Sequence, residues 1–521
     1  MARILVTEKI AEAGLDRLRA AGHEVDVQAE LTPEQLLGAM VGAHALIVRS
    51  ATQVTPEVLA AGDTLRVVGR AGIGLDNVDV AEATRRGVMV VNAPESNILS
   101  AAEHTMALLL AQARNIPQAH AALVEGRWER SQWEGVELAD KTLGVIGLGR
   151  IGRLVAARAA AFGMRLVAYD PYVTAPAARQ LGIEALDLDE LCAQADFITL
   201  HVAKTPETIG LLDADRLARC KPGVRIVNVA RGGIVVEADL AAAVASGHVA
   251  GAALDVFERE PTTESPLFGL PGVIVTPHLG ASTVEAQDKA GETIAEQIGL
   301  ALADQYVPFA VNVSAGAVAE DLRPFLGLAE RLGRLFVSLN DGVPGKLEVS
   351  YQGQLAEADT RILTLSVLKG LFANVSGVPV SYVNAPLMAE ERGVEVTEST
   401  STRPFDYVNL ISVRGGHHSV AGTVTESGAG ERLVMLDEYS VDLPPAEHML
   451  YVRNEDRPGM IGRVGTVLGD AGVNIDDMDV GRDPSGAPST MVLATGAPVD
   501  GQVVAKLRAE PGIVSVHSLS G

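Results

Sequence analysis

Three polar side chains follow predicted strands and have complementary chemistry. Arg231 lies in Asn228-Val-Ala-Arg-Gly-Gly, Glu260 ends Asp255-Val-Phe-Glu-Arg-Glu, and His278 lies in Thr-Pro-His-Leu-Gly-Ala. Histidine titrates near neutral pH, so His278 could take the proton of a secondary alcohol, and a neighbouring Glu260 carboxylate would stabilise the imidazolium. Arg231 could hold a substrate carboxylate in a bidentate fork and polarise the developing carbonyl. Together the three side chains are suited to oxidising a secondary alcohol that carries a carboxylate, if a hydride acceptor lies beside them.

Each of these residues, taken alone, also fits an ordinary structural role. Arg231 could form a loop salt bridge, Glu260 could be a solvated residue, and His278 could be a satisfied turn histidine. Their order behind a nucleotide-binding pattern favours the functional interpretation, because the ligand cleft of an open α/β sheet lies outside the carboxyl ends of its strands.

The hydride acceptor is predicted from residues 143–170. An apolar strand runs into Gly147-Leu-Gly149-Arg-Ile-Gly152, a helical segment follows, and a second strand ends in Asp170. The first glycine permits the tight turn, the second lets the backbone approach a pyrophosphate, and the third allows close helix–strand packing. The helix start supplies free N–H groups for the phosphates. Asp170 can accept hydrogen bonds from the ribose hydroxyls and would repel a 2′-phosphate, so the pattern predicts NAD rather than NADP. The alternative for the glycine pattern as a whole is a glycine-rich turn without a cofactor.

Short apolar strands alternate with helices on both sides of this pattern, which predicts two Rossmann-like parallel-sheet domains. Helix starts are indicated at Thr32-Pro33 and Thr55-Pro56, where proline takes the first helical position. A helix over 96–114 leads into the nucleotide domain and one over 283–305 leads back. Strands are expected at 4–7, 25–27, 45–49, 66–69 and 88–92, and after the fingerprint at 197–201, 225–228, 252–256 and 273–276.

The second half of the chain has a different character. An amphipathic helix is expected over 317–339, a strand over 346–353, and further mixed α/β structure up to Pro444-Pro445. The order from His448 onwards is strand, helix, strand, strand, helix, strand, which is typical of a ferredoxin-like module. Four domains are therefore predicted, at 1–97 plus 288–313, 98–287, 314–446 and 447–521, and the second of them contains the predicted NAD site.

The composition limits the class of partner. With 521 residues, 47% hydrophobic residues and a formal charge of −24, the chain is expected to be globular and to avoid nucleic acid and anionic membranes. No apolar run approaches the roughly 18–20 residues of a membrane span. The chain is expected to be cytoplasmic for two reasons. Its two cysteines lack metal-ligand spacing, and its first strand has no signal peptide before it. No metal site is expected, and His417-His418 is taken as a loop. An anionic substrate of so acidic a protein requires local arginines.

The chain resembles the D-isomer-specific 2-hydroxyacid dehydrogenases over essentially its whole length. The motifs are GLGRIG at 147–152, ARGG at 230–233, DVFEREP at 255–261 and TPHLGAST at 276–283. The resemblance implies that Arg231, Glu260 and His278 are the substrate arginine, the histidine partner and the acid/base. It implies cofactor contacts at Gly147, Gly149, Arg150, Ile151, Gly152, Asp170, Val229, Ala230, Asp255, Gly280 and Ala281.

Within this family the chain is similar to the long-form members that oxidise 3-phosphoglycerate to 3-phosphohydroxypyruvate, the first step of L-serine biosynthesis. The supporting segments are 48–50, 69–79 and 126–130. They imply a phosphate-binding set of Arg49, Arg70 and Gly72 facing the interdomain cleft, with Arg130 reaching in from a partner subunit of a homo-oligomer, a dimer of dimers. Ordinary surface ion pairs are the alternative for these arginines.

Residues 456–475, DRPGMIGRVGTVLGDAGVNI, resemble the ACT domain, a small-molecule sensor that often binds amino acids between paired copies. The resemblance implies L-serine as effector, bound through Asn454, Asp456 and Asn474. Related proteins carry tyrosine or histidine at the position of Asn454, which leaves serine sensitivity open. A dimerisation module without a ligand is the alternative.

Two other functions compete with this interpretation. Other enzymes of the same fold reduce glyoxylate and hydroxypyruvate or 2-oxoglutarate, but they need neither the extra arginines nor an amino-acid sensor. Non-catalytic relatives use NAD binding to control protein assembly, and loss of the arginine, glutamate and histidine would mark them; all three are present here.

Overall fold

The first five strands form a parallel sheet in the order β2-β1-β3-β4-β5. In the computed structural model, which describes residues 1–313, 320–340, 342–377, 379–403, 407–425, 430–437, 439–481 and 489–521, helices connect these strands. The predicted proline starts are confirmed, with Thr32 forming a capping box at the first of them. The elements are β1 (Arg3–Val6), α1 (Glu12–Ala20), β2 (Glu24–Val27), α2 (Pro33–Met40), β3 (Ala45–Val48), α3 (Pro56–Ala61), β4 (Val67–Arg70), α4 (Val80–Arg85) and β5 (Met89–Asn92).

A seven-stranded parallel sheet follows, in the order β12-β11-β10-β9-β6-β7-β8. Its central strands β6, β9 and β10 are almost fully buried, as expected where helices cover both faces. The elements are α5 (Ile98–Ala113), β6 (Thr142–Ile146), α7 (Arg150–Ala161), β7 (Arg165–Tyr169), α8 (Ala175–Gln180), β8 (Glu184–Ala185), α9 (Leu188–Gln194), β9 (Phe197–Leu200), α10 (Ala214–Arg219), β10 (Val224–Asn228), α11 (Glu237–Ala245), β11 (Val249–Leu254) and β12 (Val273–Val275).

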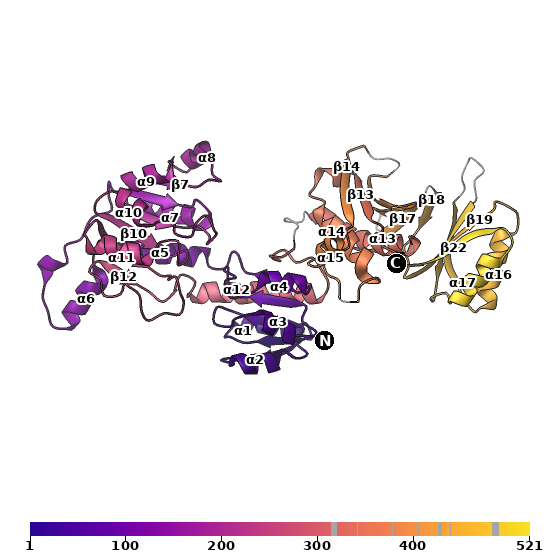
Figure 1. Cartoon of the computed structure of the whole chain (residues 1–521), viewed down its shortest axis with the longest axis horizontal. Coiled ribbons are helices and arrows are strands. Elements are labelled where there is room, and N and C mark those ends of the chain that lie inside the picture. Colours follow the sequence, from indigo (N-terminus) through magenta and orange to yellow (C-terminus); the bar gives the residue numbers. More distant parts are fainter. Residues whose placement is uncertain are drawn as a thin grey trace.

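Helix α12 (Val284–Leu302) returns the chain to the first sheet. It packs on α1 and β4, and Ile294 and Ile298 lie so close to Gly69 that a Cβ there would come within 2.8 Å of both side chains. By contrast, α6 (Ile116–Val124) and the short helix η1 (Arg130–Gln132) form an arm that projects from the seven-stranded unit (Figure 1).

The third sheet is mixed, in the order β14-β13-β15-β16-β17-β18, and only β13 and β14 run parallel. Helices α13 and α14 pack together against it. The elements are η2 (Glu320–Leu322), α13 (Phe325–Leu339), β13 (Lys346–Gly353), η3 (Gln354–Glu357), α14 (Arg361–Ala373), α15 (Ala385–Glu391), β14 (Glu395–Ser401), β15 (Asn409–Gly415), β16 (His418–Thr425), β17 (Gly430–Leu436) and β18 (Tyr439–Leu443).

The predicted start of the helix over 317–339 is wrong. The structure begins α13 at Phe325, directly after Pro324, and residues 314–319 lie outside the described part of the chain. A proline disfavours helical backbone in the residue before it, so the amphipathic pattern could not extend the helix backwards through this position.

The C-terminal sheet is antiparallel, in the order β20-β21-β19-β22, which is the ferredoxin-like arrangement predicted from the element order. Its elements are β19 (His448–Asn454), α16 (Met460–Asp470), β20 (Ile475–Gly481), β21 (Ser489–Thr495), α17 (Gly501–Ala509) and β22 (Ile513–Ser520). The expected fold class is therefore confirmed: two parallel-sheet units, a mixed α/β unit and a ferredoxin-like unit, arranged in a row (Figure 1). Among the described residues, no helix is both long and apolar enough to cross a lipid bilayer.

Candidate active site

A cleft of about 800 Å³ lies between the two parallel sheets. Its walls come from loops at the carboxyl ends of strands in both sheets, where open α/β sheets place their ligands. Five basic side chains line it, together with the acidic Asp76, Glu258 and Glu260. The basic side chains are Lys9, Arg49, Arg70, Lys204 and Arg231. The acidic chain therefore concentrates positive charge at this position, as an anionic ligand requires.

His278 and Glu260 form a pair on the nucleotide side of the cleft. Nδ1 of His278 lies 2.5 Å from Oε2 of Glu260, and Oε1 of Glu260 accepts a hydrogen bond from the Phe257 N–H at 2.9 Å. Burial alone would raise the pKa of Glu260, but the hydrogen bonds from His278 and Phe257 outweigh it and lower the pKa. The carboxylate is thus ionised at neutral pH and orients the imidazole, whose other nitrogen remains available to a substrate. The His278 side chain is 44% exposed.

Asp255 holds the backbone of His278 in place. His278 has a positive φ of 55°, which is uncommon for a residue with a side chain. Its N–H donates to the Asp255 carbonyl at 2.9 Å, while the Asp255 carboxylate accepts from the N–H groups of Leu279 and Gly280, both at 2.7 Å. Burial would raise the pKa of Asp255, but hydrogen bonds from His104, Thr276 and these backbone groups lower it.

His104 on α5 is a neighbour that the sequence did not reveal. Its Nε2 lies 3.2 Å from Oδ1 of Asp255 and 3.1 Å from the Thr276 hydroxyl. Asp255 is fully buried, so the structure gives this carboxylate a role in fastening the loop of His278. The expected contact of Asp255 with the cofactor stays a prediction.

Arg231 reaches across the cleft towards the first sheet. Its Nη1 donates to the Ala230 carbonyl at 2.8 Å, and its Nε lies 3.3 Å from Oδ2 of Asp76. The guanidinium lies against Gly74, where a Cβ would come within 2.3 Å of Nη2. The structure therefore brings Arg231, Glu260 and His278 to one cleft, as the sequence predicted.

Arg49, Arg70 and Gly72 line the opposite wall. Arg70 ends β4, and its guanidinium lies on the bare face of Gly72: a Cβ there would come within 1.7 Å of Nη1 of Arg70. Burial, with the nearby Arg231 charge, lowers the pKa of Arg70 to about 10, so the side chain stays cationic at neutral pH. Its Nε is buried without a partner. These features suit an anion binding site.

Two further cleft residues, Lys9 and Lys204, escaped the sequence analysis. Lys9 follows β1 and Lys204 follows β9, so both obey the strand-end rule that identified the arginines. Applying that rule to every strand, rather than only to recognisable motifs, would have found them.

The nucleotide fingerprint has the geometry its glycines imply. Gly147 has φ of 97°, and a Cβ there would come within 2.5 Å of the His201 carbonyl. A Cβ on Gly152 would come within 2.0 Å of the Gly147 carbonyl. Gly149 is the N-cap of α7, and no side chain caps its N–H groups, so this helix start can accept a pyrophosphate.

Asp170 lies just after β7, beside this helix start. Its Oδ2 accepts from the Leu148 N–H and its Oδ1 from the Tyr172 N–H, both at 2.8 Å. Each oxygen retains a lone pair for a ribose hydroxyl. The residues present therefore fit a dinucleotide.

The remaining expected cofactor positions lie at either end of this cradle. Arg150 is the first residue of α7 and pairs on the surface with Glu95 at 2.9 Å, and Ile151 follows it. Val229 and Ala230 follow β10; a Cβ on Gly280 would lie 3.0 Å from Val229, so these loops meet. Ala281 lines the cleft.

Arg130 does not line the cleft of its own chain. It lies in η1 on the projecting arm, where Ile116, Leu123, Val124 and Trp128 are exposed. A contribution to a partner's cleft stays a prediction.

The three expected effector residues are separated within one chain. Asn454 pairs with Ser489 at one end of β21, whereas Asn474 adjoins the other end, where Ile475 pairs with Thr495. That separation is roughly 20 Å along the strand. Asn454 is 2% exposed and its Oδ1 is buried without a partner, while Asp456 is exposed. A site containing all three would need two copies of the chain.

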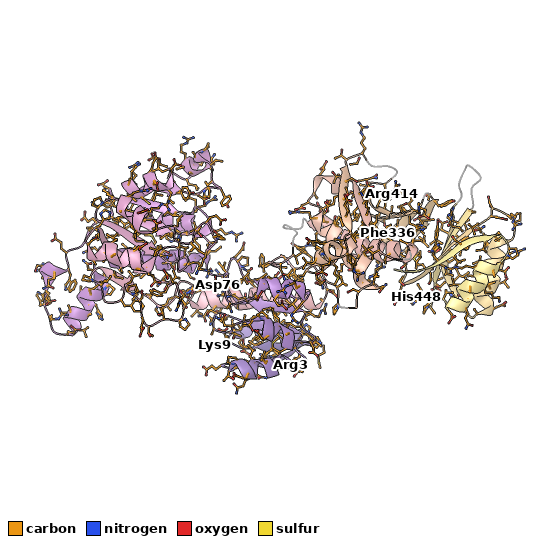
Figure 2. The ribbon with its side chains drawn as sticks, in the orientation of Figure 1. Arg3, Lys9, Asp76, Phe336, Arg414 and His448 are labelled. Atoms are coloured by element: carbon orange, nitrogen blue, oxygen red, sulfur yellow. The ribbon has the colours of Figure 1, made fainter. Side chains whose placement is uncertain are left out.

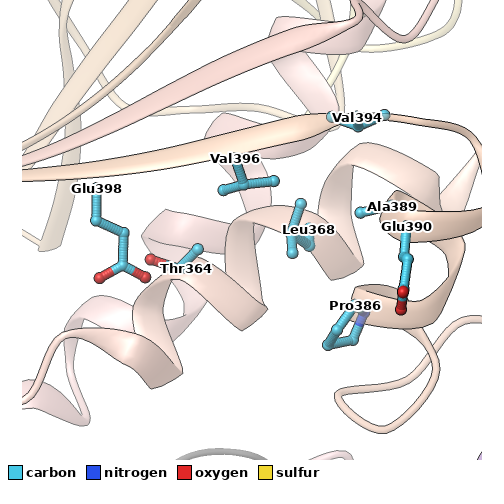
Figure 3. A pocket seen from close by; sticks show the side chains of 8 residues that line it. All are labelled: Thr364, Leu368, Pro386, Ala389, Glu390, Val394, Val396 and Glu398. Carbon is cyan, nitrogen blue, oxygen red and sulfur yellow. The ribbon is translucent and has the colours of Figure 1, made fainter.

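A second cavity, of about 500 Å³, lies in the mixed α/β unit beneath β14 (Figure 3). Its lining is mainly apolar, with Leu368 and Val396 at its centre and Glu390 and Glu398 towards its ends. No side chain in this lining suggests a reaction.

Three family models match the chain. The D-isomer specific 2-hydroxyacid dehydrogenase, NAD binding domain, matches residues 106–280. The D-3-phosphoglycerate dehydrogenase intervening domain matches residues 321–437, and the ACT domain matches residues 448–512.

Two solved structures each match about three-fifths of this chain. A Thermus thermophilus protein is 36% identical with a TM-score of 0.56, covering 59% of this chain and 99% of its own. The apo-structure of Escherichia coli D-lactate dehydrogenase is 27% identical with a TM-score of 0.54, covering 60% of this chain and 100% of its own.

Curated relatives extend over nearly the full length. The D-3-phosphoglycerate dehydrogenase of Mycobacterium leprae is 49% identical and that of Bacillus subtilis is 39% identical. The matches cover 96% of both chains in the first case and 99% of both in the second. The chain therefore belongs to the D-3-phosphoglycerate dehydrogenases, in the form that carries an intervening domain and an ACT domain.

Proposed function

We propose that this chain oxidises D-3-phosphoglycerate to 3-phosphohydroxypyruvate with NAD, the first step of L-serine biosynthesis. The single observation that carries the proposal is the arrangement of one cleft: an ionised Glu260 orients His278 on one wall, and three arginines face the same space. The names of the full-length relatives support the same substrate.

In the proposed mechanism, Arg231 binds the substrate carboxylate through its guanidinium fork. Arg49 and Arg70 hold the phosphate dianion, for which the unpartnered Nε of Arg70 is a ready donor. His278 takes the C2 hydroxyl proton on Nε2, because Glu260 engages Nδ1 and stabilises the imidazolium that forms. NAD, when bound at the fingerprint glycines, supplies the hydride acceptor.

Parallel assays of NAD reduction with 3-phosphoglycerate, D-glycerate, D-lactate and 2-hydroxyglutarate test this proposal. Substituting Arg70→Gln should raise KM for 3-phosphoglycerate while leaving the low activity on D-glycerate, which lacks the phosphate, nearly unchanged. Preferred turnover of 2-hydroxyglutarate, or reduction of glyoxylate as the main activity, would instead identify another member of the 2-hydroxyacid dehydrogenases.

We further propose that L-serine inhibits by binding between two paired ACT domains. Asn454 with its unpartnered Oδ1, Asp456 and Asn474 supply acceptors for an ammonium and a hydroxyl group. Their separation within one chain supports a site shared by two copies. The proposal includes a homo-oligomer, with Arg130 entering the partner's cleft, and a cytoplasmic location, which fits the two buried free thiols.

Point variants test serine binding better than removal of the ACT domain. Removing residues 448–521 would expose apolar core, because Met449, Tyr451 and Leu519 pack in one cluster with the intervening unit. Point variants are therefore preferable. Asn474→Ala should abolish serine inhibition and leave NAD-dependent turnover intact. Asp500→Ala, at the N-cap of α17 in the same domain, is the control and should keep the inhibition. Inhibition that competes with 3-phosphoglycerate would place serine in the cleft instead.

A further inference from the structure

Asp76 forms an ion pair that spans the cleft. Its Oδ2 lies 3.3 Å from Nε of Arg231. Asp76 belongs to the loop after β4 in the first sheet, whereas Arg231 follows β10 in the seven-stranded sheet. Figure 2 shows Asp76 on the side of the first sheet that faces the nucleotide unit. The side chain that is proposed to bind substrate is thus already paired with a carboxylate of the protein.

The other acidic groups of the cleft have different partners. Glu260 accepts from His278 and the Phe257 N–H, and Glu258 accepts from the Glu237 N–H at 3.3 Å. Among the described residues that line the cleft, Asp76 is therefore the carboxylate paired with an arginine. The Asp76 side chain is 65% exposed, so it can turn away into solvent at little cost.

The Nε edge of Arg231 is already engaged by a carboxylate of the protein. Nη1 is used by the Ala230 carbonyl, Nη2 lies against Gly74, and Nε faces Asp76. A bidentate carboxylate needs two parallel N–H donors on one edge of the guanidinium. A ligand carboxylate can take the Nε edge only when Asp76 leaves it.

We infer that Asp76 is an internal competitor: it occupies the substrate-carboxylate position on Arg231 in the empty cleft and is displaced when substrate binds. The inference rests on the proposed role of Arg231. Displacement makes binding of every carboxylate weaker, and a ligand that also carries a phosphate offsets this loss at Arg49 and Arg70. Asp76 thus lowers the affinity of the cleft for all carboxylate ligands by the same factor, and a ligand with a phosphate recovers that affinity at Arg49 and Arg70.

Asp76→Asn tests this inference because it removes the charge and keeps the shape. An ion pair with an exposed partner is worth about 0.2–1 kcal/mol. The Kd of oxamate, a 2-oxo acid analogue without phosphate, measured on the full chain with NADH, should therefore fall by a factor of about 1.4 to 5. KM for 3-phosphoglycerate should fall similarly, with kcat changed less than twofold. Asp76→Ala should give the same direction, and thermal unfolding of both variants reports their folding.

The matched control is Asp16→Asn on α1, an exposed carboxylate of the same unit that pairs with Arg19. It removes the same net charge and should leave both constants unchanged. An unchanged or raised Kd of oxamate in Asp76→Asn would overturn the inference, and a raised KM would show that Asp76 positions Arg231 instead. Oxamate binding can be measured without turnover, so this test does not depend on the identity of the substrate. Arg231→Met tests the role of Arg231 separately: loss of oxamate binding would support that role, and unchanged binding would contradict it.

Discussion

The cleft between the two parallel sheets and the joints of the intervening unit are built in different ways. Between the two units the contacts are polar: Arg231 pairs with Asp76, and Arg150 pairs with Glu95. Among the described residues, no apolar core cluster combines side chains from the two parallel sheets.

The joints of the intervening unit contain shared apolar core in addition to polar contacts. One core cluster includes Phe336 on α13 together with Tyr451 and Leu519 of the ACT unit, and Val383 packs in the core of the first sheet. A polar contact can open without exposing core to water, whereas a shared core cannot. We therefore expect the nucleotide unit to move more readily against the first unit than the first, intervening and ACT units move against one another. Substitutions in the cleft should therefore alter activity, and substitutions in the joints should alter stability.

The largest expected effect is on turnover, from His278→Ala. General acid–base catalysis contributes roughly 10²–10⁴-fold, so kcat should fall by about that factor. Because the side chain is 44% exposed, the unfolding temperature should change little. Steady-state NAD reduction and thermal unfolding measure the two effects, with His417→Ala on the third sheet as a control. Near-normal turnover would remove His278 from the mechanism.

Lys369→Ala should affect stability at a joint. Nζ of Lys369 pairs with Glu330 at 2.9 Å and lies 3.8 Å from Asp304 at the end of α12. Removing one partner of a buried ion pair lowers the free energy of unfolding by about 3–5 kcal/mol. We expect a value at the low end of this range, because Glu330 would still be paired with Arg334. Hydrogen exchange in α13 should accelerate accordingly, while kcat stays the same. The exposed Lys346, paired with Glu395, is the matched control.

The pH dependence of this joint follows from the same lysine. Burial alone would lower the pKa of Lys369, but Tyr382 and Glu330 outweigh burial and raise it. A raised pKa in the folded state means that the stabilisation is fully present below about pH 10 and is lost as the pH rises through the raised value. If the protection of α13 against hydrogen exchange already declined between pH 7 and pH 9, Lys369 would not be the cause of the pH dependence.

The smallest expected effect comes from Val383→Ala. Val383 is 3% exposed in the core of the first sheet. Its truncation should cost about 1–3 kcal/mol, between the values for smaller and larger core deletions. Protease sensitivity of the joint should rise while KM for 3-phosphoglycerate stays constant; the exposed Val375 provides the control. A changed KM would mean that this joint and the cleft are coupled, and the contrast between them would fail.

The nucleotide unit was the most predictable part of the chain. The helix over 96–114 is observed as Ile98–Ala113, and the fingerprint strands are observed within a residue of their expected bounds. Glycine positions and apolar runs determine these elements locally. The intervening unit was less predictable, since Pro324 shortened its first helix and its mixed sheet depends on pairing across long sequence separations.

The sequence by itself determined the fold class, the dinucleotide cradle and the partnership of His278 with Glu260, because spacing along a few strands decides each of them. The tertiary structure alone revealed the Asp76–Arg231 pair and the support of Asp255 by His104, since each joins residues some 150 positions apart. It also revealed that Asn454 and Asn474 lie at opposite ends of one sheet. Such contacts depend on how whole units pack against one another, which local patterns of residue type do not encode.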